Sequence, residues 1–319
     1  MDLTGYKWKI TPEIAESLLE IEILKRVFEK IPLSPESVKK LLRKSLLNSA
    51  VSSARIENIP STTENPRKEG NNLLRAYQRI YANPDPEPLT VDIIKDLHAR
   101  ALAGLSGMAG QFRQEPWGIF NQAGIEIHHA PLHIHIPQLV SDLVLLINKL
   151  ERDHPSVIAA VTQFIFEKIH PFADGNGRAG RLVSAYLLHR SGFGFGGLIS
   201  LENYINEHRN WYYQALEPSH NSTNFIDFFL GAVVTQANKT LDEIKNSPVE
   251  SPESNLMPRR RELLAVIRDH PECSFDFLRR RFMEVKPLVI HRDLAFLHKN
   301  GLIKKLGTTR GAVYVDLDS

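Results

Sequence analysis

The sequence of 319 residues contains one cysteine, Cys273, so no internal disulfide can form. It has no apolar run approaching the roughly 20 residues that a membrane-spanning helix needs, and Met1 to Ile10 lacks the apolar stretch of a secretion signal. Internal repeats and low-complexity tracts are also absent. These absences predict a soluble, cytoplasmic protein built from ordinary globular domains, with no membrane partner.

Net charge is small as well, at +2, but it is unevenly distributed. Residues 259–319 hold 13 Lys/Arg against 8 Asp/Glu, a net of +5, whereas the rest holds 26 against 29, a net of −3. A stretch rich in serine and proline separates these parts. Composition and charge predict a linker at 246–258 and a C-terminal domain at 259–319. The motifs described below divide the residues before the linker into an N-terminal helical region at 1–90 and a core at 91–245.

The most informative segment runs from His170 to Arg181 and reads His-Pro-Phe-Ala-Asp-Gly-Asn-Gly-Arg-Ala-Gly-Arg. Helical periodicity precedes it at 154–169 and follows it at 177–190, so a second helix begins inside the segment. The first turn of a helix has unpaired amides that attract phosphate, and two arginines three residues apart share one helix face. The pattern predicts a polyphosphate site, with His170 as general base and Asp174 as a ligand of Mg²⁺.

This segment resembles in full the H-P-F-x-[D/E]-G-N-G-R-x-x-R signature of the Fic family, whose typical members transfer AMP from ATP to a protein hydroxyl. Upstream, 110–113 is similar to the family's G-x-F-R element, and 125–137 is similar to its flap, a β-hairpin over the active site. Downstream, 212–217 resembles the Y-Y-x-x-L segment of the nucleotide pocket. The resemblance implies a mainly α fold, in which a helical core carries a β-hairpin flap. Leu132 departs from the second proline of many flaps, which concerns local flap geometry.

The same resemblance implies a set of site residues. His170 is the expected catalytic base, and Asp174 is the expected metal ligand. The expected nucleotide-binding residues are Ile127, His128, His129, Ala130, Asp174, Gly175, Asn176, Gly177, Arg178, Ala179, Gly180, Arg181 and Tyr213. Histidines 128, 129, 133 and 135 are interpreted as exposed flap residues, because their spacing fits no standard zinc pattern.

A second resemblance concerns regulation. Residues 53–58 are similar to the [S/T]-x-x-x-E-[G/N] inhibitory helix of a subset of the family, which makes Ser53, Glu57 and Asn58 the expected inhibitory residues. The surrounding residues 35–59 are predicted to be helical, with Ser34 as a possible cap. In such proteins the glutamate, here Glu57, pairs with the second motif arginine, here Arg181. A carboxylate and the γ-phosphate of ATP would then compete for one guanidinium group.

The C-terminal domain is predicted to contain three helices followed by a hairpin. Helices are expected at 261–270, after Ser274 and from Pro287, and strands at 302–306 and 312–317. This α+β order resembles winged helix-turn-helix proteins, with Arg310 at the wing tip. DNA contacts by His291, Arg292, His298 and Lys299 would follow, although such modules also dock proteins or dimerise.

The leading hypothesis is a self-inhibited protein adenylyltransferase that uses ATP and Mg²⁺. It would modify a Ser, Thr or Tyr hydroxyl of a target protein bound along the flap, or of itself, and release pyrophosphate. One alternative is a transcriptional regulator whose core senses nucleotide. Another is a Fic enzyme that moves a different nucleotide or removes AMP. The target and the oligomeric state, including a homodimer, are left open by the sequence.

Overall fold

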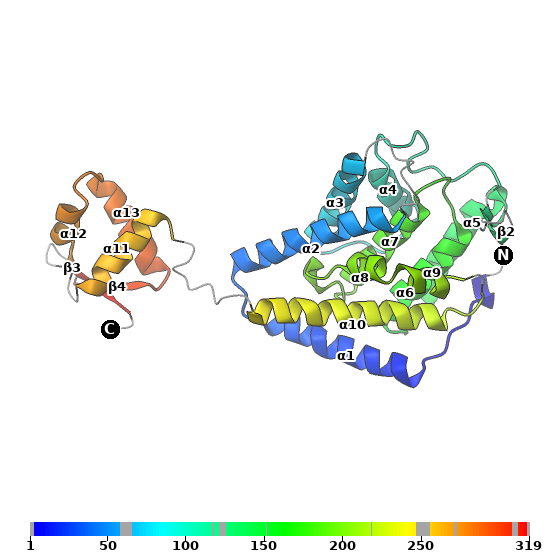
Figure 1. Ribbon diagram of the computed structural model, residues 1–319, viewed down its shortest axis with the longest axis horizontal. Helices are drawn as coiled ribbons and strands as arrows, with labels where there is room; N and C mark the ends of the chain where they lie inside the picture. Colours follow the sequence, from blue (N-terminus) through cyan, green and yellow to red (C-terminus); the bar gives the residue numbers. More distant parts are fainter. Residues whose placement is uncertain are drawn as a thin grey trace. The chain divides into compact units, whose positions relative to one another are not determined.

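The computed structural model describes residues 3–57, 66–116, 118–120, 126–150, 152–217, 219–246, 256–270, 273–307 and 312–317. The chain divides into two compact units, Met1–Asp242 and Glu243–Ser319 (Figure 1). Each unit has a buried apolar core of its own. Among the helices within these described ranges, none is long and apolar enough to cross a membrane.

After a short 3-10 turn, η1 (Leu3–Gly5), the first unit opens with three helices, α1 (Pro12–Lys30), α2 (Pro35–Ile56) and α3 (Pro66–Ala82). Each begins with a proline, whose fixed φ suits the first helical position. Thr11 and Ser34 cap α1 and α2, because each side chain accepts a hydrogen bond from a backbone amide of the first turn. The helix predicted at 35–59 is confirmed as far as Ile56, and Asn58 and Ile59 lie outside the described residues.

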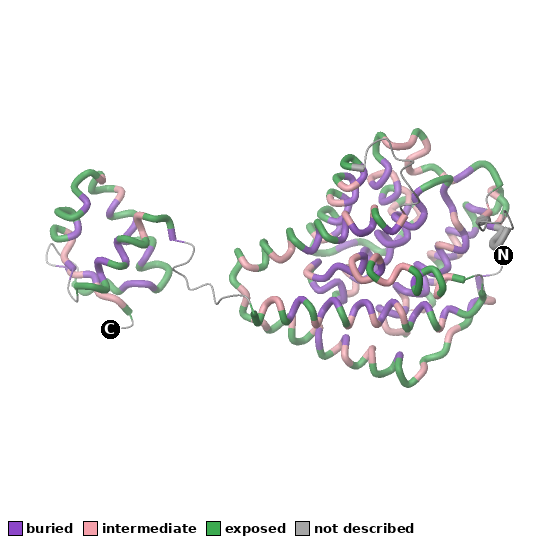
Figure 2. The backbone as a smooth tube through the Cα atoms, in the orientation of Figure 1, coloured by how far each residue is buried: buried purple, intermediate pink, exposed green. Residues whose placement is uncertain are grey.

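The centre of this unit is formed by two buried helices, α6 (Pro155–Ile169) and α7 (Asn176–Arg190), which pack against each other. Every residue of α7 from Asn176 to Leu188 is buried, as the purple tube in Figure 2 shows. A helix surrounded on all sides needs no polar face, which agrees with its small and apolar side chains. Both helices were predicted, and the His170–Arg181 segment spans the turn between them and the start of α7.

The remaining helices of the unit are α4 (Val91–Ala101), α5 (Ile136–Lys149), α8 (Leu201–Glu207), α9 (Arg209–Ala215) and α10 (Thr223–Asn246), with 3-10 turns η2 (His133–His135) and η3 (Phe195–Gly197). Helix α7 is packed against α2, α3, α4 and α6, and α2 also packs against α3 and α8. The N-terminal helices therefore contact the helix that carries the motif arginines.

The hairpin lies earlier in the chain than predicted. Its strands are β1 (Gly118–Phe120) and β2 (Glu126–His129), which pair in antiparallel fashion. Within the predicted flap at 125–137, only β2 is a strand, because 133–135 form η2 and α5 begins at Ile136. The alternation of polar and apolar residues at 132–136 imitates a strand, but Pro137 occupies the second position of a helix, where its missing amide costs no hydrogen bond.

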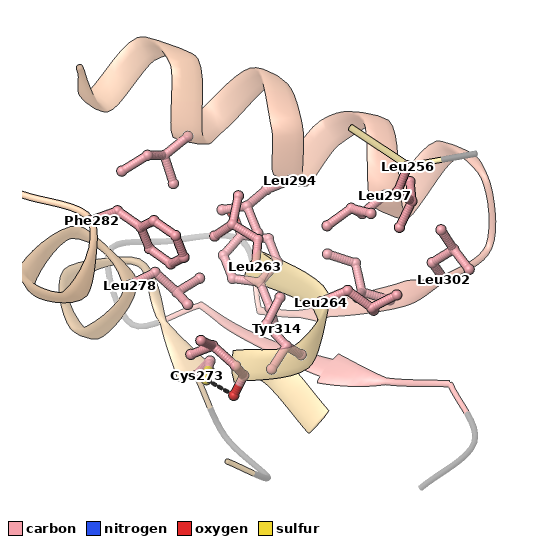
Figure 3. Packing of buried hydrophobic residues seen from close by; sticks show 14 residues of the cluster. Leu256, Leu263, Leu264, Cys273, Leu278, Phe282, Leu294, Leu297, Leu302 and Tyr314 are labelled. Atoms are coloured by element: carbon pink, nitrogen blue, oxygen red, sulfur yellow. Dashed lines mark hydrogen bonds between the residues drawn. The ribbon is translucent and has the colours of Figure 1, made fainter. Parts of the chain in front are cut away.

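The second unit consists of α11 (Pro258–Asp269), β3 (Cys273–Ser274), α12 (Phe275–Arg281), α13 (Pro287–Lys299), β4 (Ile303–Leu306) and β5 (Val313–Asp316). The predicted order of three helices and a hairpin is present, and the unpredicted β3 completes an antiparallel sheet in the order β3-β5-β4. Leucines of α11 and α13 pack with Tyr314 and the buried Cys273 (Figure 3). Arg310 lies outside the described residues.

A buried carboxylate organises one face of this unit. Asp293 of α13 is 1% exposed and accepts hydrogen bonds from Nε of Arg259 at 2.6 Å and Nε of Arg260 at 2.7 Å. The Arg260 guanidinium also lies over the Phe296 ring, 3.8 Å from its centre. Part of the basic excess of the unit therefore stabilises its own fold.

Candidate functional site

The turn between α6 and α7 is shaped by two left-handed residues. His170 ends α6 with φ 49° and ψ 62°, and Gly175 precedes α7 with φ 75°. A side chain at Gly175 would be strained, and its Cβ would lie 2.9 Å from Cδ1 of Leu102. The turn thus needs glycine at this position, and it places the unpaired first amides of α7 a few residues after His170.

Arg113, from the predicted G-x-F-R element, ties this turn to the segment after the hairpin. Its Nε donates to the carbonyl of His170 at 2.8 Å and its Nη1 to the carbonyl of Glu115 at 2.8 Å. Its Nη2 donates to the carbonyl of Pro131. Because the Arg113 residue is only 3% exposed, these carbonyls replace the water that a guanidinium otherwise binds.

Asn176 and His98 hold the rest of the turn. The Asn176 amide group donates to the carbonyl of Phe172 at 2.7 Å and accepts from the amide of Phe172 at 2.8 Å. Nδ1 of His98 accepts from the amide of Gly110 at 2.9 Å, so Nε2 carries the proton and donates to the carbonyl of Asp174 at 2.9 Å. Burial lowers the pKa of His98, which keeps the ring neutral in this role.

Arg181 is 1% exposed and pairs with two residues of α2 and its end. Its Nη1 donates to Oε1 of Glu57 at 2.8 Å, its Nε to Oγ of Ser53 at 3.0 Å, and its Nη2 to the carbonyl of Ser53 at 3.0 Å. Ser53 and Glu57 are four residues apart, so they lie on one helix face. The S-x-x-x-E spacing is what lets both reach a single guanidinium group.

Glu57 also covers the first turn of α7. A Cβ built on Gly177 would lie 2.0 Å from Oε1 of Glu57, so only glycine admits the carboxylate at this place. The hydroxyl of Tyr213 donates to the carbonyl of Ile56 at 3.0 Å and thereby fixes the end of α2. The Glu57 side chain nevertheless remains 33% exposed.

Arg178 forms a second pair of the same type. Its Nη1 donates to Oε1 of Glu69 at 2.6 Å, and both side chains are 5% exposed. Its Nη2 donates to Oδ1 of Asp174 at 2.7 Å, and the same oxygen accepts from the amide of Gly175 at 2.6 Å. The Asp174 side chain is 68% exposed, so its other oxygen can meet solvent or a ligand.

A third carboxyl lies near Arg181. Burial, and the Glu57 carboxylate to a lesser extent, raise the pKa of Glu167 to about 8, although Arg181 and Lys168 oppose the shift. Its Oε1 is buried with no hydrogen-bond partner among the described residues. Burial alone would lower the pKa of Arg181, but Glu57 and two tyrosines, Tyr212 and Tyr77, raise it above its ordinary value. Arg181 is therefore always charged, and Glu167 is mostly neutral at pH 7.

A magnesium ion fits this site through one protein ligand. Mg²⁺ keeps several waters and is commonly bound by one or two carboxylates plus substrate phosphates. Asp174 offers one such carboxylate with an exposed oxygen. Within the described parts of the chain, no group of three His, Cys, Asp or Glu residues could hold a metal ion by protein ligands alone. The flap histidines 128 and 129 fall outside that search, because their side chains are not described.

Comparison with known proteins places this geometry in a family. Residues 88–188 match the model of the Fic/DOC family. Residues 88–188 of the chain thus form a Fic domain. "Protein adenylyltransferase Fic" of Drosophila melanogaster is 34% identical over 115 residues, which are 33% of this chain and 21% of the relative. The counterpart in Drosophila ananassae is 33% identical over 115 residues. The chain thus spans about a fifth of the curated relatives it matches.

Solved Fic structures share the fold. A Fic family protein from Desulfovibrio desulfuricans G20 superposes with a TM-score of 0.68 at 21% identity and covers 98% of both chains. A Fic domain containing signalling protein from Bacteroides thetaiotaomicron has a TM-score of 0.60 at 19% identity, over 74% of this chain and 99% of its own. These likenesses confirm a mainly α Fic fold.

The structure gathers most of the predicted site residues. The Fic motif from Asp174 to Arg181 lies at the start of α7, beside Ser53, Glu57 and Tyr213. Ala130 is buried just after β2. The backbone of Ile127, His128 and His129 belongs to β2, whereas their side chains and all of Asn58 lie outside the described part of the chain.

Three residues of this site were missed by sequence reasoning, namely Glu69, His98 and Glu167. Each acts on the Fic motif from another helix, α3, α4 or α6. A glutamate in the first turn of a helix is common for helix stability alone, so Glu69 gave no specific signal. Glu167 was the one with a usable signal, because a carboxylate within an otherwise apolar helix run is unusual.

Proposed function

We propose that this protein is a self-inhibited protein adenylyltransferase. One observation carries the proposal: Glu57 pairs with Arg181 directly over Gly177, at the helix start where a nucleotide's phosphates would bind. The name of the Drosophila relatives supports adenylyl transfer as the activity of the matched segment. The chain's own residues support the choice of reaction, because a histidine, a carboxylate and two arginines meet at one helix N-terminus.

In the proposed reaction, the hydroxyl oxygen of a target Ser, Thr or Tyr attacks the α-phosphorus of ATP. His170 accepts the hydroxyl proton, the bond from the α-phosphorus to the bridging oxygen breaks, and pyrophosphate leaves with that oxygen. Arg113 would keep His170 in place through the backbone carbonyl of His170. The products are AMP joined to the target through a phosphodiester, pyrophosphate, and a protonated histidine that later loses its proton to solvent.

The first turn of α7 would hold the phosphates. Its amides and the guanidinium of Arg178 face negative charge that grows on the leaving group. Arg181 would bind the γ-phosphate once Glu57 has left, and so orient the leaving group opposite the attacking hydroxyl. When bound at Asp174, Mg²⁺ would neutralise part of the phosphate charge.

Inhibition would follow from competition for Arg181. Glu57 forms a charge-assisted hydrogen bond to Nη1, and Ser53 occupies the other donors. A γ-phosphate needs the same Nη1 and the space above Gly177. Its charge and the Glu57 carboxylate would also repel each other, so ATP would bind without its productive orientation until the end of α2 moves.

The β1–β2 hairpin is the proposed docking element for the target. An extended segment can add to an exposed strand by backbone hydrogen bonds, which needs little sequence specificity. The link from Pro131 through Arg113 to His170 would keep the docked hydroxyl in register with the base. Self-modification would use the same element.

The second unit is proposed to be a winged helix-turn-helix module, with α13 as the helix presented to a partner. His291, Arg292, His298 and Lys299 of α13 are exposed. Arg259 and Arg260, in contrast, are committed to Asp293. The positive charge available to DNA is thus smaller than the composition implies, and contact with a protein remains the other proposal for this surface.

The test is labelling with α-labelled ATP and Mg²⁺, using wild type, Glu57→Gly, and Glu57→Gly combined with His170→Ala. We expect label on protein with Glu57→Gly only, at least about a hundredfold above the variant without His170. Arg55→Ala is the matched control, because it changes an exposed side chain of the same helical turn without loosening the helix, and it should stay as silent as wild type.

No label in any variant, with GTP, CTP and UTP equally silent, would refute the transferase. Label from another nucleotide alone would retain the mechanism and change the substrate. Loss of AMP from a modified target without net labelling would instead identify removal of AMP.

A further inference from the structure

The contact between Arg178 and Glu69 does more than join two helices, because Arg178 also contacts Asp174. Arg178 donates one nitrogen to Glu69 at 2.6 Å and the other to Asp174 at 2.7 Å, so a single guanidinium joins a buried carboxylate to an exposed one. The three groups together carry one net negative charge. The exposed member of the group is Asp174, which places that surplus charge at the surface.

Glu69 is held rigidly. One turn further along α3, the side chain of Asn72 donates to the carbonyls of Ala101 at 3.3 Å and Ala103 at 3.0 Å. The Asn72 residue is 6% exposed, and it fixes the first half of α3 to the end of α4. Lys68 donates to the carbonyl of Gly104 at 2.7 Å in the same region. The position of the Glu69 carboxylate is therefore set by the fold and not by a flexible surface helix.

Arg178 is correspondingly restrained. Its residue is 4% exposed, and its Nε is buried with no hydrogen-bond partner among the described residues. An unpaired buried donor lowers the stability of the fold. The two carboxylates, Glu69 and Asp174, therefore hold the guanidinium in place. The orientation of the Asp174 carboxylate then follows from the orientation of Arg178, since both act on the same oxygen, Oδ1.

We propose that Glu69 is a positioning residue for the metal ligand of the phosphate site. Through Arg178, Glu69 holds Oδ1 of Asp174 and leaves the other Asp174 oxygen for Mg²⁺. The negative charge of Glu69 also gives the group of three side chains the net negative charge that a cation would balance. This inference rests on the proposed function, because it assumes that Asp174 binds a magnesium ion together with a nucleotide. Outer groups that orient a metal ligand typically contribute 10- to 100-fold to metal affinity or activity.

The test measures binding and needs no catalysis. In the full chain carrying Glu57→Gly, Mg²⁺ is titrated by calorimetry into protein saturated with α,β-methylene-ATP, whose α–β link cannot be cleaved. Adding Glu69→Gln should raise the Mg²⁺ concentration for half saturation by about tenfold or more. The analogue without metal, in EDTA, should bind at least as tightly as before, because the change removes a negative charge near the phosphates.

Two further variants make the result decisive. Glu69→Asp retains the charge but shortens the reach by one methylene, so it should give an intermediate shift and serves if the glutamine variant does not fold. Asn71→Ala changes an exposed side chain of the same helix and leaves both Asn72 and Arg178 in place, so it should leave the Mg²⁺ titration unchanged.

An unchanged titration in both Glu69 variants would overturn the proposal and leave Glu69 as a link between α3 and α7. Equal weakening with and without metal would also overturn it. A parent variant that binds the analogue but transfers no label would refute the transferase alone, and the comparison of Mg²⁺ titrations would still stand.

Discussion

Arg178 and Arg181 lie three residues apart on α7, and each pairs with a glutamate near the end of an N-terminal helix. The Glu69 side chain is 5% exposed and sits in the first turn of α3, where the helix amides favour negative charge. Glu57 is 33% exposed and sits at the C-terminal end of α2, where the carbonyls disfavour it. The same two residue types thus form an enclosed pair in one place and a partly exposed pair in the other.

Under the proposed function, one buried helix would serve as both a scaffold and a switch. A carboxylate enclosed by protein cannot be replaced by water or phosphate without opening the core. A carboxylate at a solvent-exposed helix end can leave by fraying one turn. The two pairs differ in burial and in helix polarity more than in the distance between their charged atoms.

The largest expected difference is in stability. Glu69→Ala leaves Arg178 buried with one of its two carboxylates gone, which should lower the free energy of unfolding by about 3 kcal/mol. Glu57→Ala leaves a partly exposed space that water can fill, so it should lower the free energy of unfolding by only about 1 kcal/mol. Urea unfolding of both variants and wild type at pH 7 measures this, and equal losses would contradict the distinction between the two pairs.

A smaller effect tests whether α2 is held by more than its ion pair. Tyr213→Phe removes the hydrogen bond to the carbonyl of Ile56 and keeps the ring. A net loss of about 1 kcal/mol should raise the labelling rate of the otherwise wild-type protein by roughly fivefold. The same change made with Glu57→Gly should have no such effect, since no inhibitory contact remains. An equal increase in both backgrounds would contradict a role of this hydrogen bond in inhibition, and a decrease in both would place Tyr213 in catalysis.

An effect that depends on pH concerns Glu167, the buried carboxyl near Arg181. Its pKa of about 8 lies above the ordinary value of 4.5, so the folded state binds more protons between these pH values. The contribution of Glu167 is therefore fully present below pH 4.5 and is lost as the pH rises through 8. Glu167→Gln should flatten the fall in stability across this range by up to about 1 kcal/mol per pH unit. Thermal unfolding from pH 5 to 9 measures it, and identical slopes would show that Glu167 is not protonated at pH 7.

The helices that carry the site were predictable because their signals are local. Pro155 at the start of α6, Ser34 before α2 and the glycines of the Fic motif each act within one turn of their own helix. The flap was placed at 125–137 only through resemblance to the family. That range missed β1, because the pairing of β1 with β2 depends on residues before it.

The long-range contacts of the site were less predictable than its helices. The pair of Glu57 with Arg181 was inferred only through resemblance to a family motif, since 124 residues separate the two. The pair of Glu69 with Arg178 spans 109 residues and had no motif to reveal it. Spacing along one helix says which face a residue occupies, but not which distant helix covers that face.

The sequence by itself determined the chemistry: a histidine, a carboxylate and two arginines at a helix start, within a Fic motif. It also determined the order of helices, because capping and periodicity are short-range effects. The tertiary structure alone decided which arginine has an enclosed partner and which has a partly exposed one. That choice depends on burial, and burial arises only when α2 and α3 pack against α7 and water is excluded from one contact more than from the other.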